Sequence, residues 1–148
     1  MNRIINIGLI GCGVVGLKRI SNLPKNFKLI ACADPKISLI KKNINDKDIF
    51  LTKKWNELIN LDNLQAVIIA TTHHLHSVII KACIKKNIHI FVEKPAGISA
   101  LETKKIISLL KSKNFIALRV GYNHRYHPAF ILAKKIINKN KIGDLMYL

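Results

Sequence analysis

Short apolar runs alternate with amphipathic segments along the whole of this 148-residue chain. The apolar runs are rich in isoleucine and valine, which is typical of strands that are covered on both faces of a parallel sheet. We predict strands at 4–10, 28–34, 49–51, 66–71, 88–95 and 115–120. Apolar residues at helical spacing predict helices at 14–24, 55–59, 75–86, 99–113 and 128–138, and the lysine-rich stretch 36–43 is either a short helix or irregular.

This alternation, with no internal repeat and no low-complexity linker, predicts an α/β fold built on a doubly wound parallel sheet. In such a sheet the carboxyl ends of the strands meet at one edge, and ligands bind in the crevice there. At 148 residues and 49% hydrophobic, the chain is long enough to bury one substantial core. Functional residues are therefore expected where the strands end.

The turn after the first strand reads GCGVVG, from Gly11 to Gly16. Its glycines suit a dinucleotide site, because Gly11 makes a tight turn, Gly13 lets the backbone approach a pyrophosphate, and Gly16 lets helix pack on strand. The pyrophosphate then lies on free N–H groups at a helix N-terminus. Asp34 ends the second strand, where a carboxylate suits the ribose 2′-hydroxyl. The sequence therefore predicts a dinucleotide-binding site at this edge of the sheet.

Polar residues also follow three later strands, as a ligand-binding edge requires. They occupy 71–76, 93–95 and 121–125. Lys94 is the candidate with a chemical role, because an ammonium in a closed cleft can stabilise negative charge that develops on a substrate oxygen. Glu93 is expected either to orient this lysine or to hold a ribose. The alternative is that both are solvated residues that close a strand.

Together these motifs resemble the Gfo/Idh/MocA oxidoreductases, a family that includes glucose–fructose oxidoreductase and inositol dehydrogenase. The resemblance runs from end to end and rests on GCGVVG, Asp34, the alanine–threonine pair followed by His76, EKP at 93–95 and GYNHRYHPAF at 121–130. It implies a Rossmann domain that binds NAD or NADP. It also implies hydride transfer between the nicotinamide and a carbinol carbon of a sugar, polyol or nucleotide sugar, with Lys94 as the catalytic residue.

By the same resemblance, the cofactor contacts the glycine turn and three further strand ends. The residues expected to bind it are Gly11, Cys12, Gly13, Val14, Val15, Gly16, Asp34, Thr71, Thr72, His76, Glu93 and Lys94. Tyr122, Asn123 and Arg125 match a loop near the family's active site and are candidate substrate residues, unless they pack at the start of a helix. The chain has Thr72 and His73 where the family typically has proline and asparagine, so the loop beside the nicotinamide ribose departs from the pattern.

The choice between NAD and NADP depends on the end of the second strand. Asp34 can accept hydrogen bonds from a ribose 2′-hydroxyl and favours NAD. Lys36, two positions later, is able to reach a 2′-phosphate, so NADP remains possible.

Charge and cysteine content narrow the function classes. The formal net charge is +17, yet the basic residues are spread as lysine pairs on predicted helix faces, so no nucleic-acid partner is expected. Cys12, Cys32 and Cys83 lie far apart in apolar segments, which predicts buried thiols and no disulfide framework. No metal site is expected at the histidines of 73–76, because no carboxylate or cysteine stands near them in the sequence.

The chain has neither an apolar run of eighteen residues nor a secretory leader pattern, so a cytoplasmic protein without membrane contact is expected. We predict a dinucleotide-binding domain at 1–121. Residues 122–148 are expected to form a connecting helix and the truncated start of the family's substrate and oligomerisation domain. GDLMYL, at 143–148, looks like the turn and first strand of that domain.

Two functions are compatible with these features. The first is the NAD(P)-binding domain of a truncated or split oxidoreductase, inactive until a partner chain or homo-oligomer completes the site for a sugar-like substrate. The second is a non-catalytic module that binds a dinucleotide or another protein.

Overall fold

The computed structural model describes residues 3–44, 47–113, 115–144 and 146. Its six strands are β1 (Ile5–Ile10), β2 (Phe27–Ala33), β3 (Phe50–Thr52), β4 (Ala66–Ile69), β5 (His89–Val92) and β6 (Leu118–Val120). Its helices are α1 (Val14–Ile20), α2 (Ile37–Asn43), α3 (Trp55–Leu58), α4 (His73–Lys85), α5 (Ala100–Lys111) and α6 (Pro128–Asn138), with a 3-10 helix, η1 (Asn123–Tyr126). Each predicted strand up to 120 is present, and the stretch 36–43 contains a helix.

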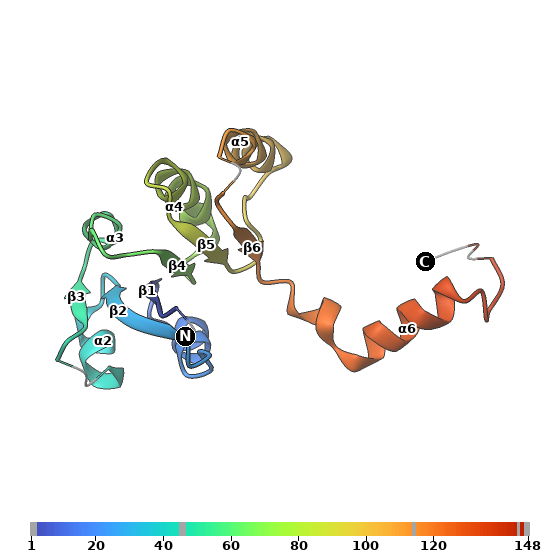
Figure 1. Cartoon of the computed structure of the whole chain (residues 1–148), viewed down its shortest axis with the longest axis horizontal. Coiled ribbons are helices and arrows are strands. Elements are labelled where there is room, and N and C mark those ends of the chain that lie inside the picture. The colour runs from blue at the N-terminus through green and yellow to red at the C-terminus, as the bar shows by residue number, and fades with distance from the viewer. Residues whose placement is uncertain (1–2, 45–46, 114, 145, 147–148) are drawn as a thin grey trace.

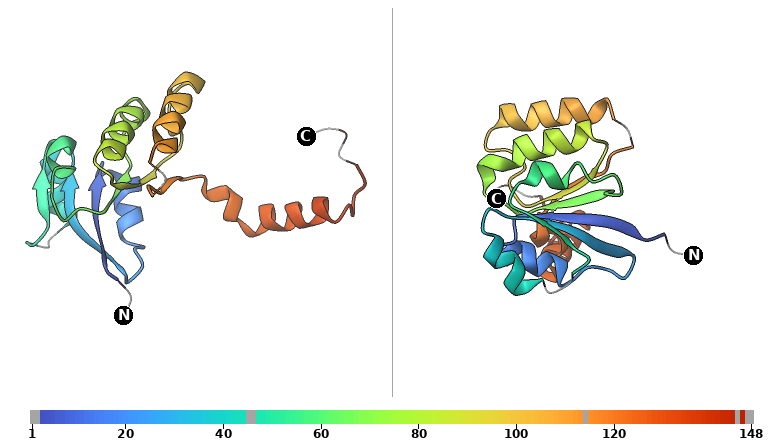
Figure 2. Two further views of the ribbon diagram at one scale, coloured as in Figure 1. Left: turned by 45° about the horizontal axis from the view of Figure 1, so that its top comes forward. Right: turned by 90° about the vertical axis from the view of Figure 1, so that its left-hand side faces the viewer.

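All six strands are parallel and lie in the order β3-β2-β1-β4-β5-β6. Helices α3, α4 and α5 lie on one face of this sheet, and α1 and α2 lie on the other (Figures 1 and 2). The chain reverses its direction of winding between β3 and β4, on either side of β1. This order confirms the doubly wound α/β fold and gathers the carboxyl ends of the strands at one edge.

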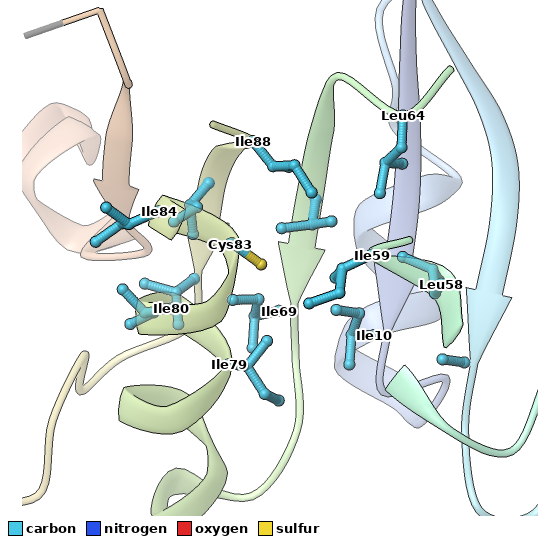
Figure 3. Close-up of a cluster of buried hydrophobic side chains, with 14 of the residues drawn as sticks. Ile10, Leu58, Ile59, Leu64, Ile69, Ile79, Ile80, Cys83, Ile84 and Ile88 are labelled. Carbon is cyan, nitrogen blue, oxygen red and sulfur yellow. The ribbon is translucent and has the colours of Figure 1, made fainter. Parts of the chain in front are cut away.

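The core has two parts because both faces of the sheet are covered. Ile69 packs with Ile79 and Cys83 of α4, as Figure 3 shows. Its neighbour Ile68 belongs to the cluster on the other face, with Ile40 of α2. Consecutive residues of one strand are thus both buried, which explains why β4 reads as an uninterrupted apolar run.

Helix α5 begins with the capping sequence at 99–102. The Ser99 side chain accepts a hydrogen bond from the Glu102 N–H at 3.2 Å. The Glu102 carboxylate accepts one from the Ile98 N–H at 3.0 Å, which turns the chain into the helix. These hydrogen bonds fix the residue at which α5 begins after the segment that follows β5.

Helix α6 leads away from the sheet and packs on η1 (Figure 1). Pro128 occupies its first turn, and the His127 side chain accepts a hydrogen bond from the Ala129 N–H at 3.3 Å. Phe130 and Leu132 are exposed. The helix predicted at 128–138 is therefore present, with an apolar surface open to solvent. The strand predicted at 143–148 falls partly on 145, 147 and 148, which lie outside the described residues.

The three cysteines are buried, as predicted. A hydrogen bond with the Cys12 thiol, together with burial, raises the pKa of Cys32 far above its ordinary value. Burial alone raises the pKa of Cys83 to about 12. All three therefore serve as small apolar side chains within the two core clusters.

The stability of the chain is expected to fall at alkaline pH through Cys83. Its folded-state pKa of about 12 lies above the value of about 8.5 for an unfolded thiol, so its stabilising effect is complete below about pH 8.5 and is lost as the pH rises toward 12. Within that window, ionisation of this thiol in the unfolded chain is expected to lower the free energy of unfolding by about 1 kcal/mol per pH unit. Urea titrations of wild type and Cys83→Val across the window measure the difference. Equal pH slopes for the two proteins would contradict the prediction.

Candidate functional site

The glycine turn between β1 and α1 has a conformation and packing that require two of its glycines. Gly11 has φ +93°, a region that L side chains rarely adopt, and a Cβ there would lie 2.6 Å from the Ala70 carbonyl oxygen. A Cβ on Gly16 would lie 2.0 Å from the Gly11 carbonyl oxygen. Gly11 thus makes the turn, and Gly16 lets α1 pack directly on it.

Gly13 differs from the other two glycines. A Cβ there would meet nothing within 4 Å, so the space above this residue is open. Gly13 is the N-cap of α1, and the exposed residues Val14 and Val15 form the first turn. The open space therefore adjoins a helix start, where N–H groups and the helix dipole favour an anion such as a pyrophosphate.

Asp34 follows β2 and lies directly beside the glycine turn. One carboxylate oxygen accepts a hydrogen bond from the Cys12 N–H, and the other accepts one from the Lys36 N–H, both at 2.8 Å. These bonds hold the carboxylate between the turn and the start of α2. Each oxygen keeps a further lone pair, so the group can still accept from ribose hydroxyls.

A cleft of about 380 Å³ joins these parts. It is lined by Ile10, Gly11, Gly13, Ala33, Asp34, Pro35, Lys53, Trp55, Ala70, Thr71, Thr72 and Leu75. Its size and its mostly apolar lining with a few polar groups are those of a small-molecule site. The structure thus brings together the glycine turn, Asp34 and the loop after β4, as the sequence predicted for the edge of the sheet.

Trp55 and Lys53 line the same cleft and were not among the predicted site residues. Trp55 packs against the core and also forms part of the cleft wall. No sequence motif marks either position. They enter the site because β3 ends beside β2, at the same edge as Asp34.

His76 connects the loops that follow β4 and β5. Its ring is fully buried, with Nδ1 2.7 Å from the Pro95 carbonyl oxygen and Nε2 3.0 Å from the Thr71 carbonyl oxygen. Both ring nitrogens thus face main-chain carbonyl groups. His76 therefore bridges the two loops that hold Thr71 and Lys94.

Glu93, at the end of β5, pairs with Arg19 of α1. The Arg19 Nε donates to a Glu93 carboxylate oxygen at 2.5 Å, and its Nη2 donates to the Asn123 side-chain oxygen at 3.2 Å. Sequence reasoning missed Arg19. The available signal was its position three residues after Gly16, on the helix face that meets the sheet.

The remaining predicted residues are at the same edge but more exposed. Lys94 is exposed, and a cis peptide bond joins it to Pro95. Tyr122 is also exposed, and the Arg125 guanidinium lies 5.6 Å from the centroid of the Tyr126 ring. The structure therefore places the predicted catalytic and substrate residues outside the cleft that holds Asp34.

The histidines at the start of α4 have other contacts. The rings of His73 and His76 lie 5.7 Å apart in an edge-to-face arrangement, and His74 Nε2 lies 3.5 Å from the Thr72 hydroxyl. Within the described part of the chain, no group of three or more His, Cys, Asp or Glu residues is placed to hold a metal ion. Nor is any helix of that part long and apolar enough to cross a membrane.

Comparison with known proteins agrees with this geometry. A family model described as "Oxidoreductase family, NAD-binding Rossmann fold" matches residues 5–122. The uncharacterized oxidoreductase YrbE of Bacillus subtilis is 30% identical over 146 residues, which cover 97% of this chain and 42% of that protein. Levoglucosan dehydrogenase of Pseudarthrobacter phenanthrenivorans is 31% identical over 155 residues, which cover 96% of this chain and 39% of that protein.

Among solved structures, scyllo-inositol dehydrogenase of Lactobacillus casei, with bound NAD(H) and scyllo-inositol, shares the fold. The TM-score is 0.87 at 20% sequence identity, over 96% of this chain and 43% of that one. The chain spans about two-fifths of the length of the curated relatives it matches. It belongs to the Gfo/Idh/MocA oxidoreductase family, and its residues 5–122 are the NAD-binding Rossmann domain of that family.

Proposed function

We propose that this chain is the cofactor-binding half of a dehydrogenase that moves hydride between NAD and a carbinol carbon of a sugar or polyol. The observation that carries the proposal is the cleft in which the glycine turn, Asp34 and the loop after β4 meet. The names of two relatives, a levoglucosan dehydrogenase and a scyllo-inositol dehydrogenase, support the substrate class.

The residues present fit a dinucleotide. The open space above Gly13 leaves room for a pyrophosphate, and the Asp34 carboxylate retains acceptor capacity for ribose hydroxyls. The same carboxylate repels a 2′-phosphate, so we infer a preference for NAD over NADP. The exposed Lys36 beside it is the feature that would allow NADP.

Bound NAD supplies the hydride acceptor, and the chain supplies the groups around it. We assign the nicotinamide end to Thr71, Thr72, Glu93 and Lys94, beyond the Asp34 end of the cleft. The carbinol hydroxyl loses its proton to a base that we assign, with the rest of the substrate site, to residues outside these 148. The Lys94 ammonium donates a hydrogen bond to the carbinol oxygen and stabilises the negative charge that develops there. Tyr122, Asn123 and Arg125 belong to the loop that would face the substrate.

We assign the rest of the substrate site to residues outside these 148, whether on this chain, on a partner chain or on a second copy. This follows from the domain division at 121–122, which remains a prediction, and from the relatives being more than twice as long. We also propose a cytoplasmic location, because three buried free thiols suit a reducing compartment. The second candidate function is a non-catalytic NAD-binding module. It is favoured by the cleft, because the glycine turn, Asp34 and the loop after β4 that line it all belong to this one chain.

The purified chain is expected to bind NADH saturably and to show no turnover by itself with NAD and myo-inositol. Binding follows from the cleft, and the missing turnover follows from the assignment of the rest of the substrate site to residues outside these 148. Titration of NADH fluorescence measures the first, and absorbance at the NADH band measures the second. NADPH is expected to bind about tenfold more weakly, because its 2′-phosphate meets Asp34.

Gly13→Trp, which fills the open space above the turn, is the variant expected to lose NADH binding. Lys111→Ala, at the exposed far end of α5, is the matched control and is expected to bind as wild type. Failure of both cofactors to bind the folded wild type would overturn the proposed site. Turnover by the 148 residues alone would overturn the assignment of the rest of the substrate site to residues outside them.

A further inference from the structure

Arg19 lies on the helix that begins at the glycine turn, yet its side chain reaches the ends of β5 and β6. Besides its bonds to Glu93 and Asn123, the guanidinium lies 5.4 Å from the centroid of the Phe91 ring. The side chains of Arg19 and Glu93 are 27% and 14% exposed, so this ion pair is screened less than a surface pair. One residue of α1 thereby connects three separate segments of the site.

Glu93 has little freedom to move in this arrangement. A Cβ on Gly121 would lie 3.0 Å from the second Glu93 carboxylate oxygen, so the backbone just after β6 closes one side of the carboxylate. Arg19 closes another side. The main chain at Glu93 is fixed as well, since its N–H donates to the Ile69 carbonyl oxygen at 2.9 Å.

Lys94 is therefore flanked by two anchored residues. Glu93 before it is bound by Arg19 of α1, and the carbonyl group of Pro95 after it lies 2.7 Å from the His76 ring of α4. The Lys94 side chain itself is exposed. The direction in which its Cα–Cβ bond leaves the main chain thus depends on the two neighbours, which are held from helices on opposite faces of the sheet (Figure 2).

We propose that Arg19 is a positioning residue, which holds Glu93 and Asn123 so that Lys94 faces the nicotinamide end of the cofactor. The inference rests on the role given to Lys94 in the proposed function. Arginine suits the task because its planar fork presents donors in two directions. A lysine at the same place offers a single ammonium, which would pair with Glu93 without also holding Asn123.

The test compares two ligands and one chemical probe. NADH contains the nicotinamide, and ADP-ribose lacks it. In Arg19→Met, the NADH dissociation constant is expected to rise about tenfold, the effect of losing one hydrogen bond between the misplaced, charged Lys94 and the nicotinamide end of the cofactor. The ADP-ribose constant is expected to stay within about twofold. General destabilisation would weaken both ligands alike.

Acetylation of Lys94, followed by site-resolved mass spectrometry, reports the position of the lysine directly. NADH is expected to slow the acetylation of Lys94 in the wild type. In Arg19→Met this protection of Lys94 is expected to be lost. Arg19→Lys is expected to restore part of it, because the charge on Glu93 stays paired. Lys18→Met, an exposed neighbour on the same helix, is the matched control and is expected to behave as wild type.

The possible failures are separable. If NADH binds the wild type without protecting Lys94, the proposed role of Lys94 is wrong. If NADH protects Lys94 equally in wild type and Arg19→Met, that role stands and the inference about Arg19 is overturned. Equal weakening of NADH and ADP-ribose would also overturn it. If Arg19→Met does not fold, Arg19→Lys is the deciding variant. Protection of Lys94 by NADH that is as strong in Arg19→Lys as in the wild type would then overturn the inference.

Discussion

Gly16→Ala is expected to destabilise the chain by about 3 kcal/mol, the upper range for forcing extra volume into a packed site. The new methyl group would lie 2.0 Å from the Gly11 carbonyl oxygen, which belongs to the main chain and cannot turn aside as the end of a flexible side chain can. Gly11 cannot move away, because its own Cα faces the Ala70 carbonyl group at the end of β4. Urea unfolding, with the midpoint and slope fitted separately, measures the loss.

Gly13→Ala is the matched control for that prediction. Its methyl group meets nothing within 4 Å, and the residue already has extended backbone angles, so the change in unfolding free energy is expected to stay within about 0.5 kcal/mol. NADH binding should weaken instead, because the methyl group occupies the space assigned to the pyrophosphate. Equal destabilisation by the two substitutions would show that contact between α1 and the turn is not what Gly16 provides.

Asp34→Arg is expected to weaken NADH binding about a hundredfold, since a charged acceptor for two ribose hydroxyls is lost. NADPH is expected to bind this variant more tightly than NADH does, because the new guanidinium pairs with a 2′-phosphate. The substitution also removes the acceptor for the Cys12 and Lys36 N–H groups. Titrations with both cofactors, alongside thermal unfolding, separate the loss of binding from the loss of stability.

Asp34→Asn is the conservative comparison. Its side-chain oxygen can still accept from the Cys12 N–H, whereas its amide nitrogen faces the Lys36 N–H, where two donors meet. NADH binding is expected to fall between wild type and Asp34→Arg, without a switch toward NADPH. If Asp34→Arg bound NADH as tightly as wild type does, Asp34 would have no part in the cofactor site.

The sequence predicted most of the sheet because burial on both faces leaves a clear signal. The run 66–71 was predicted as a strand and contains β4, which is shorter because the chain leaves the sheet where the polar loop begins. The edge residues followed from the fold class, since parallel strands place their carboxyl ends together. Their arrangement within one cleft needed the strand order, which no single run of residues encodes.

Side-chain contacts between distant segments were beyond the reach of sequence patterns. Arg19 and Glu93 are 74 positions apart, and neither helical periodicity nor strand alternation relates them. His76 matched the family motif, but the motif gives no sign that both its ring nitrogens face carbonyl groups. Such contacts depend on helix position to within a few ångströms, whereas periodicity determines only which face is buried.

The pairing of β1 with β4 has a consequence for the order in which the domain folds. β1 is made first but lies in the middle of the sheet, and Asn6 at its start bonds to Gln65, 59 positions later. A nascent chain can join β1 to β2 early, yet the central pair must wait until β4 has left the ribosome. Because contacts between distant residues form more slowly than local ones, the β1–β4 pair at the centre of the sheet is expected to form after the β1–β2 pair beside it.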